Sequence, residues 1–265
     1  MKRDGRVVVT DLDGCLLDAT TYCWEAARPA LDALRRRGIP LVLCSSKTRA
    51  EMEPLHADLG LDAPYVFENG GGIVFPPGAR WSRVARRDGG PLLVRLGVPL
   101  RDLARALMEI AREAGARLRG FSRLSHREVS DLTGLPDPAV ARAREREHDE
   151  PFLLESGDEA AVRQAAERRG LRVTKGGRFH HLTGAVDKGK AVRQVLTLLA
   201  PAASIGLGDA ENDLGLLDAV DRPILVPRAD GSFDPALVVA FPGAERAPAA
   251  GPEGWNHAVL HALSG

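Results

Sequence analysis

The stretch VVVTDLDGCLLD, residues 7–18, decides the fold. Its three valines and Thr10 are β-branched and predict a strand buried on both faces. Asp11 and Asp13 follow this strand two positions apart, so their carboxylates point to the same side. Like charges repel each other, and each loses solvation when it is buried. A plain strand-to-turn junction is the alternative, but it usually needs one aspartate, and the pair favours a site that uses both carboxylates.

The composition argues against several classes of protein. The chain has 265 residues, enough for one large domain or two modest ones, and its 36 basic residues balance 36 acidic ones. We therefore expect neither nucleic acid nor a membrane as partner. Cys15, Cys23 and Cys44 have no CxxC spacing, which favours a reduced compartment. No apolar run approaches the roughly 18 residues of a membrane span, and we expect a soluble, cytoplasmic monomer or homodimer.

Apolar runs alternate with amphipathic stretches of helical period, a pattern typical of parallel βαβ units. On either side of a central segment, the sequence predicts strands at 7–10, 39–45, 203–209 and 222–226, a strand, glycine turn and return strand over 63–75, and helices at 25–38, 48–59, 187–200, 212–219 and 252–263. The central segment predicts an antiparallel α+β insert with strands at 92–96, 151–155, 171–175 and 178–183, helices at 100–115 and 157–169, and an irregular arginine-rich middle. The prediction is an α/β core of residues 1–84 and 186–265, interrupted by an insert at 85–185.

Polar side chains follow three of the predicted core strands. They are Asp11 and Asp13 after the first strand, Ser45 after the second, and Asp209 after the strand at 203–209. The carboxyl ends of parallel strands share one edge of a sheet, where such folds bind their ligands. Lys188 begins the helix that leads to this edge, and Asp213 lies about one turn into the helix that leaves it. We therefore expect these carboxylates, a hydroxyl and a lysine to converge.

This set of side chains suits phosphoryl transfer through an enzyme aspartate. A phosphate monoester repels a bare carboxylate, whereas Mg²⁺ prefers oxygen ligands and neutralises both groups. We expect Asp11 to be the nucleophile, and Asp13 to protonate the leaving oxygen and then deprotonate the attacking water. Asp209 would bind the metal together with Asp11 and the backbone carbonyl of Asp13. Ser45 and Lys188 would hold the phosphate oxygens.

Four segments, in order, resemble the motifs of the haloacid dehalogenase-like phosphatases. They are DLDG at 11–14, the serine after LVLC, DKGK at 187–190 and GLGDAEND at 206–213. The resemblance covers nearly the whole chain and implies a Rossmann-like core with a parallel sheet and an inserted α+β cap of the C2 type. It also implies Mg²⁺ as cofactor, with Asp213 and Asn212 in support of the metal site and Lys188. Cys15 departs from the pattern, because threonine is usual there.

Finer matches resemble one group within this family, the mannosyl-3-phosphoglycerate phosphatases. They are SSKTR at 45–49, ENGGGI at 68–73, REHDEPF at 146–152 and GGRFHHL at 176–182. This resemblance implies a small phosphorylated sugar-glycerate substrate. The residues that it implies around the phosphate, the glycerate carboxylate and the sugar are Ser46, Lys47, Asn69, Gly70, Arg178 and His180. Those that it implies for the mannose hydroxyls are Glu147, Asp149 and Glu150.

Several alternatives stay open at this point. The same chemistry could serve another sugar phosphate, such as glucosyl-3-phosphoglycerate, a hexose phosphate or sucrose phosphate. A phosphomutase would share both aspartates of the first motif, and a sugar-phosphate-binding regulator would need no catalysis at all. Ser45 could merely cap the following helix, and Asn69 with Gly70 could merely form a hairpin turn. His180 and His181 alternate between the faces of one strand, and we place His180 toward the site.

Overall fold

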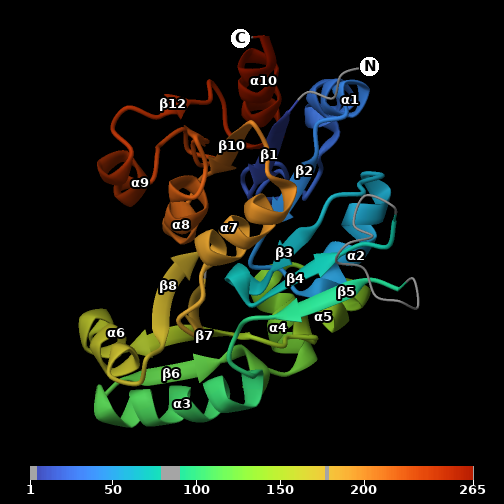
Figure 1. Ribbon diagram of the computed structural model, residues 1–265. Helices are drawn as coiled ribbons and strands as arrows, with labels where there is room; N and C mark the ends of the chain where they lie inside the picture. Colours follow the sequence, from blue (N-terminus) through green and yellow to red (C-terminus); the bar gives the residue numbers. More distant parts are fainter. Residues whose placement is uncertain (1–4, 79–89, 177–178, 265) are drawn as a thin grey trace.

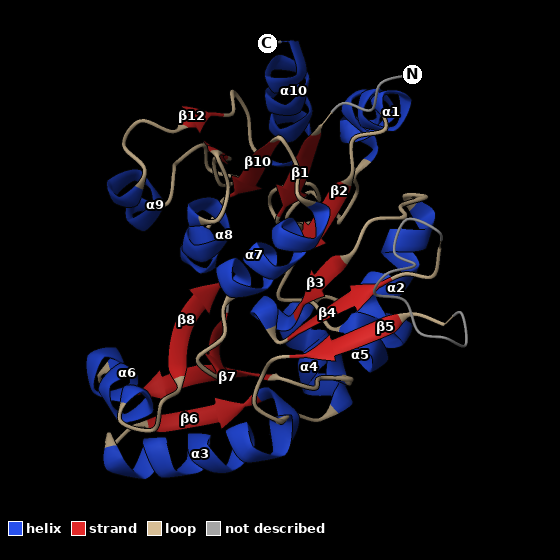
Figure 2. Cartoon of the chain, viewed as in Figure 1, coloured by secondary structure: helices blue, strands red, loops and turns tan. Residues whose placement is uncertain are grey.

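The computed structural model describes residues 5–78, 90–176 and 179–264, and its strands form two sheets of different kind (Figures 1 and 2). The larger sheet has eight strands in the order β12-β11-β10-β1-β2-β3-β4-β5. Their bounds are β1 Arg6–Thr10, β2 Leu41–Cys44, β3 Tyr65–Phe67, β4 Gly72–Phe75, β5 Leu92–Arg95, β10 Ala203–Gly208, β11 Arg222–Leu225 and β12 Glu245–Arg246.

Helices cover both faces of the larger sheet. They are α1 Arg28–Arg37, α2 Arg49–Asp58, α7 Lys188–Leu199, α8 Leu214–Asp218, α9 Pro235–Ala240 and α10 Gly251–Ser264, with the 3₁₀ turns η1 Glu25–Ala27, η2 Glu68–Gly70 and η5 Glu211–Asp213. β1 pairs in parallel with β10 and β2. Val8 packs on the side of α1 and α10, whereas Val7 and Val9 pack on the side of α7 and α8. The predicted parallel α/β core is therefore confirmed.

The smaller sheet is antiparallel and has the strand order β6-β7-β9-β8. Its strands are β6 Arg117–Gly120, β7 Asp149–Ser156, β8 Arg172–Gly176 and β9 Phe179–Thr183, and the helices on one of its faces are α3 Leu100–Glu113 and α6 Glu159–Glu167. Leu103 and Val162 from these helices pack against Phe152 and Leu182 of the sheet. No helix of the described segments has both the length and the apolarity to cross a membrane.

The strand predicted at 92–96 belongs to the other sheet, so that part of the prediction is wrong. β5 pairs antiparallel with β4, with Leu92 opposite Phe75, and extends the larger sheet. Leu92 and Val94 pack into its apolar core. A short apolar strand at a junction satisfies either sheet equally well in sequence, and only packing decides between them. The predicted boundary between residues 84 and 85 lies outside the described residues.

The arginine-rich middle of the insert is helical rather than irregular. It contains η4 Phe121–Arg123, α4 His126–Thr133 and α5 Asp137–Arg144. The sequence carries signals for both helices. Ser125 and Glu128 form a reciprocal capping box at the start of α4, and Pro138 stands in the first turn of α5. The sequence did not predict these helices, because the many charged residues obscure the apolar period on which helix prediction depends.

Candidate active site

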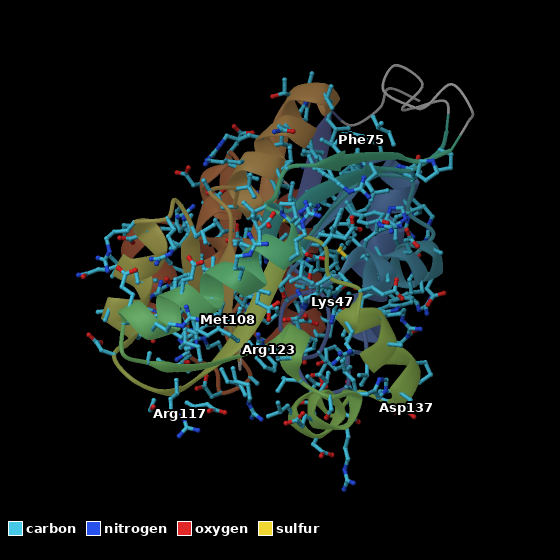
Figure 3. All side chains as sticks on the ribbon, turned by 90° about the horizontal axis from the view of Figure 1, so that it is seen from below. Lys47, Phe75, Met108, Arg117, Arg123 and Asp137 are labelled. Atoms are coloured by element: carbon cyan, nitrogen blue, oxygen red, sulfur yellow. The ribbon has the colours of Figure 1, made fainter. Side chains whose placement is uncertain are left out.

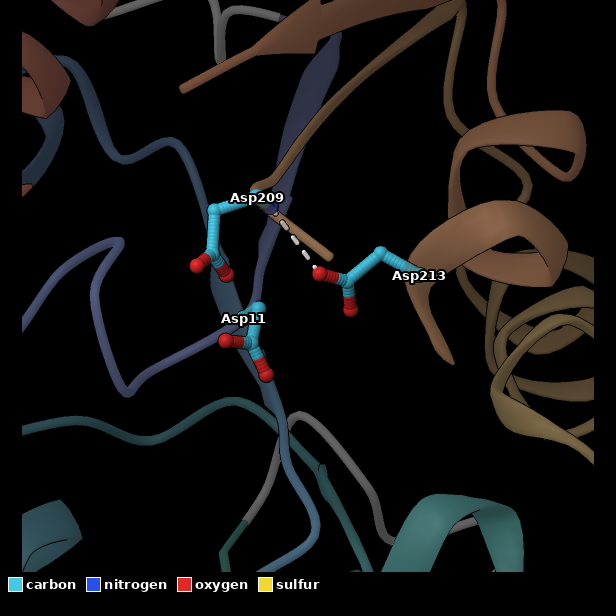
Figure 4. A group of neighbouring side chains, drawn as sticks. All are labelled: Asp11, Asp209 and Asp213. Atoms are coloured by element: carbon cyan, nitrogen blue, oxygen red, sulfur yellow. Dashed lines mark hydrogen bonds between the residues drawn. The ribbon is translucent and has the colours of Figure 1, made fainter. Parts of the chain in front are cut away.

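Three aspartates meet at the carboxyl ends of β1 and β10 (Figure 4). Asp11 directly follows β1, Asp209 directly follows β10, and Asp213 belongs to η5. One carboxylate oxygen of each lies within 4.8 Å of those of the other two. Asp213 Oδ2 also accepts hydrogen bonds from the backbone N–H groups of Asp209 at 3.0 Å and Ala210 at 3.2 Å. The parallel pairing of β1 with β10 thus brings together residues that lie about 200 positions apart in sequence.

Lys188 is the cation of this cluster. It is the first residue of α7, and its Nζ donates hydrogen bonds to Asp11 Oδ1 at 2.5 Å and Asp213 Oδ1 at 2.7 Å. The side chain is fully buried. Burial disfavours its charge, but Asp11 and Asp213 outweigh burial and raise the pKa of Lys188 well above its ordinary value. The lysine is therefore charged and fixes the orientation of Asp11.

Even with Lys188, the cluster has more carboxylates than cations. Burial raises the pKa of Asp11 to about 7, with Asp213 adding to the effect and Lys188 opposing it. Burial, together with Asp11 and Asp213, also raises the pKa of Asp209 well above its ordinary value. A divalent cation among these oxygens would relieve the repulsion, and carboxylate oxygens are the ligands that Mg²⁺ prefers. The donor set therefore fits a hard divalent cation.

Asp13 lies beside the cluster rather than within it. Its side chain is 38% exposed, and Lys47 Nζ lies 2.9 Å from its Oδ1. Figure 3, viewed from the side of the smaller sheet, shows Lys47 near the middle of the molecule. The φ angle of Gly14 is 81°, and a Cβ atom there would lie 2.8 Å from Asp209 Oδ2. Among the described residues, the three-carboxylate group contains Asp213 in addition to Asp11 and Asp209, whereas the predicted contribution of Asp13 to the metal is its backbone carbonyl.

The segment after β2 carries three predicted site residues, Ser45, Ser46 and Lys47, at the same edge of the sheet. Ser46 and Lys47 line the cavity described below, whereas the described lining does not include Ser45. Ser45 is buried, and its Oγ accepts a hydrogen bond from the Lys47 N–H at 3.2 Å. It does not cap α2, because Thr48 is the N-cap and forms a capping box with Glu51. Ser45 therefore supports the loop that presents its two neighbours.

A cavity of about 750 Å³ lies between the acidic cluster and the insert. Side chains on its core wall include Asp11, Asp13, Lys47, Asp209 and Asn212. Side chains on its insert wall include Phe121, Arg146, Lys175, Phe179 and His181. One wall thus offers carboxylates that can hold a metal, and the other offers basic and aromatic groups. This arrangement suits an anionic ligand with a polar body.

Two predicted substrate residues lie on the opposite face of the smaller sheet, so their predicted placement is wrong. Glu150 Oε1 accepts hydrogen bonds from the N–H and Oγ of Ser122. His180 stacks on Phe152, with ring centroids 5.3 Å apart. Side chains alternate along a strand, so His181 reaches the cavity in place of His180. The sequence HH at 180–181 cannot show which histidine faces inward. Arg178 lies outside the described residues.

Three other predicted substrate residues lie at the junction between core and insert. Asn69 Nδ2 donates a hydrogen bond to Asp149 Oδ2 at 2.9 Å, and both side chains are buried. The Glu147 carboxylate pairs with Arg49 and Arg95, each at 3.1 Å. The described lining of the cavity includes none of the three. These residues therefore connect the two sheets.

The turn that carries Asn69 has an unusual backbone. Glu68, Asn69 and Gly70 have φ angles of 48°, 54° and 94°, in the left-handed region that most side chains avoid. At Gly70 a Cβ atom would overlap the carbonyl oxygen of Asp187, so only glycine fits there. Such strain persists only where the surroundings enforce it. The turn is thus held in place from both sides, by α7 and by the insert.

Glu68 should make the stability of the protein depend on pH. Its buried carboxylate accepts hydrogen bonds from the backbone N–H groups of Glu147 and His148. Burial nevertheless raises the pKa of Glu68 from 4.5 to about 7. The folded state therefore holds a proton that the unfolded chain releases, and stability falls as pH rises through this window.

Glu68→Gln should reduce this pH-dependent fall in the free energy of unfolding by up to about 3 kcal/mol, because the variant has no carboxyl group to titrate. Urea unfolding at about pH 5 and pH 8, with Mg²⁺ present, measures the difference in the free energy of unfolding between the two pH values. Glu53→Gln is the control: Glu53 is exposed, so its replacement should leave that difference unchanged.

Comparisons with known proteins agree with this site. A family model described as haloacid dehalogenase-like hydrolase matches residues 8–80. The chain is 38% identical over 263 residues to the glucosyl-3-phosphoglycerate/mannosyl-3-phosphoglycerate phosphatase of Methanococcoides burtonii, covering 96% of each chain. It is 33% identical over 228 residues to the mannosyl-3-phosphoglycerate phosphatase of Pyrococcus furiosus, covering 83% of this chain and 90% of the relative.

Solved structures show the same fold at lower identity. The crystal structure of Thermoplasma acidophilum 0175 superposes with a TM-score of 0.70 at 19% identity and covers 97% of each chain. The match extends over both sheets, so the insert is part of the shared fold. The identities to the two phosphatases above show that this chain belongs to the haloacid dehalogenase-like hydrolases, in the family of the glucosyl-3-phosphoglycerate/mannosyl-3-phosphoglycerate phosphatases.

Proposed function

We propose that this protein is a Mg²⁺-dependent phosphatase that hydrolyses mannosyl-3-phosphoglycerate to mannosylglycerate and phosphate in the cytoplasm. The observation that carries the proposal is the meeting of Asp11, Asp209 and Asp213 beneath a cavity with a basic opposite wall. The two relatives described above are named for this substrate, and one of them is also named for the glucosyl compound. Glucosyl-3-phosphoglycerate is therefore the second candidate substrate.

The reaction that we propose proceeds in two displacements at phosphorus. An Asp11 oxygen attacks the phosphorus atom while the bond to the glycerate oxygen breaks, and Asp13 gives its proton to that leaving oxygen. Asp13 then takes a proton from water, which attacks the same phosphorus atom and releases phosphate from Asp11. Asp13 suits this role because it borders the cavity and is partly exposed. Lys188 keeps Asp11 oriented for attack through its 2.5 Å hydrogen bond.

The residues that would hold Mg²⁺ are Asp11, Asp209 and Asp213, with the Asp13 backbone carbonyl as a further ligand. The ion would neutralise the phosphate oxygens and the carboxylates that approach them. Ser46 and Lys47 border the same part of the cavity and are the side chains that we propose for binding the transferred phosphate. Ser45, which directly follows β2, would hold a phosphate oxygen as predicted, and its Oγ also orders the loop that carries both.

We propose that the insert is a cap that selects the substrate. Its wall carries Arg146 and Lys175, whose charges suit the glycerate carboxylate. Because β5 belongs to the core sheet, the boundary that we propose moves from residue 85 to the segment between β5 and α3. A cap that contacts the sugar and the carboxylate would make the enzyme discriminate against small phosphate esters.

Phosphate release from a panel of esters tests the proposed function. The panel contains mannosyl-3-phosphoglycerate, glucosyl-3-phosphoglycerate, mannose 6-phosphate, sucrose 6-phosphate and 3-phosphoglycerate, each with Mg²⁺ and with EDTA. We expect EDTA to abolish release and Mg²⁺ to restore it. With Mg²⁺, kcat/KM for the mannosyl compound should exceed that for 3-phosphoglycerate by at least ~100-fold, about 3 kcal/mol of transition-state binding.

Other outcomes would revise the proposal in different ways. Equal values for the glycosyl compounds and the simple esters would contradict selection by the insert but keep the chemistry. A preference for the glucosyl compound would replace the substrate. No release from any ester, with the protein folded and Mg²⁺ present, would favour a regulator that binds sugar phosphates without hydrolysing them.

A further inference from the structure

A chain of hydrogen-bonded side chains, buried except for the half-buried Asn212, connects the acidic loop to the insert wall of the cavity. Asn212, which lies between two aspartates of the cluster, donates a hydrogen bond from Nδ2 to Asn69 Oδ1 at 3.2 Å. Asn69 in turn donates from its own Nδ2 to Asp149 Oδ2 at 2.9 Å. His181 Nδ1 lies 2.8 Å from the same Asp149 oxygen. The chain thus runs from η5 through the strained turn at 68–70 to strands β7 and β9.

Asp149 is the centre of this chain. Its side chain is fully buried, and Arg146 Nη1 lies 3.4 Å from its Oδ2. Burial alone would raise the pKa of Asp149, but His181 and Arg146 outweigh burial and hold that pKa below its ordinary value. Asp149 is therefore ionised, and an ionised acceptor requires that His181 carry a proton on Nδ1. The buried carboxylate thus contacts two side chains that line the cavity.

We propose that Asp149 is a positioning residue that holds His181, as the imidazolium, so that the N–H of its other nitrogen, Nε2, donates a hydrogen bond to the glycerate carboxylate of the substrate. The inference rests on the proposed function. It assigns His181 as the residue that contacts the carboxylate and Asp149 as the residue that positions His181. Asn69 makes the arrangement depend on contact between core and insert, because it belongs to the core and bonds to an insert side chain. The substrate-facing histidine is then correctly placed only when the insert lies against the core.

The charges of the two cavity walls support this assignment. The phosphate must lie at the core wall, where Asp11 and the proposed metal ligands are. The substrate's second anionic group then faces the insert wall, where Arg146, Lys175 and His181 are the basic side chains among the described lining. A purely structural role for Asp149 would explain its contacts with Asn69, but it would not explain why both of its basic partners border the cavity.

Two variants and a matched pair of substrates test the inference. His181→Gln and Asp149→Asn are compared on mannosyl-3-phosphoglycerate and on its analogue in which a hydroxymethyl group replaces the carboxylate. We expect each variant to raise KM for the carboxylate substrate by ~10- to 100-fold with little change in kcat, and to change KM for the analogue by less than ~3-fold. His180→Gln is the control, because it alters the neighbouring histidine on the other face of the strand.

A double variant separates positioning from general stabilisation. If Asp149 acts through His181, Asp149→Asn should have no further effect on KM once His181 is replaced by glutamine. Equal losses on both substrates, or effects of the two changes that multiply, would overturn the inference. If Asp149→Asn does not fold, the His181→Gln comparison decides alone. Wild-type protein that is inactive on mannosyl-3-phosphoglycerate would contradict the proposed function itself, whereas active wild type with unchanged discrimination in His181→Gln would contradict only this inference.

Discussion

Asp11→Asn is expected to reduce phosphate release by more than ~10³-fold, to a rate near background. The amide has almost the same shape as the carboxylate but is not a nucleophile toward phosphorus, so the covalent step fails. The amide oxygen of the variant can still accept a hydrogen bond from Lys188, and removing one of several mutually repelling carboxylates should not destabilise the fold. Steady-state phosphate release with Mg²⁺ measures the effect.

Binding of inorganic phosphate distinguishes this loss from misfolding. We expect Asp11→Asn to unfold at a temperature no lower than that of the wild type, and to be stabilised by added phosphate and Mg²⁺ in the same thermal scan. Retention of more than ~1% of the wild-type rate would show that Asp11 is not the nucleophile. A protein that acts only by binding sugar phosphates would lose nothing with this change.

Lys188→Met should have the second-largest effect, and it should act on stability as well as on activity. Lys188 is fully buried between Asp11 and Asp213, and removing it leaves two buried carboxylates without their cation. Breaking a buried ion pair on one side typically costs about 3–5 kcal/mol. We expect a loss of about 3 kcal/mol in the free energy of unfolding at pH 8, together with loss of turnover. Urea denaturation in the presence of EDTA measures the first effect.

Two further variants show whether charge is the cause. Lys190→Met alters an exposed lysine on the same helix and should change stability by less than about 0.5 kcal/mol. Asp213→Asn added to Lys188→Met removes one of the unpaired carboxylates and should restore part of the lost stability. If Lys188→Met were as stable as the wild type, or if the added Asp213→Asn gave no recovery, the account of the buried ion cluster would be wrong.

The convergence of Asp11, Asp209 and Lys188 could be predicted because it depends on one rule. Residues that directly follow parallel strands share an edge of the sheet, so their spacing along the chain is irrelevant once the strands are recognised. The valines of β1 and the apolar run of β10 are strong strand signals, and the helix between them must begin near the same edge. The structure bears out this geometry for all three residues.

The insert wall could not be predicted in the same way. The pairing of β9 with β7 and β8 decides which of the two adjacent histidines faces the cavity. Two identical neighbouring residues give no information about this register. The prediction for Glu150 was wrong for the same reason, because Glu150 lies one position from a cavity-facing residue. Arg146 and Lys175 reach the cavity from segments about 30 positions apart, brought together only by the antiparallel sheet. Their shared position at the cavity depends on tertiary packing alone.

A rapid-quench measurement tests the central claim most directly. Mannosyl-3-phosphoglycerate labelled at phosphorus is mixed with excess Asp13→Asn protein and Mg²⁺, and the reaction is stopped in acid. Because this variant lacks the proton donor of the first step as well as the base of the second, both steps are slow. The account predicts that label appears on the protein before free phosphate, is released by hydroxylamine as expected for an acyl phosphate, and maps to the peptide containing Asp11. Label on another residue, or phosphate formed with no labelled protein at any time in wild type or variant, would contradict it.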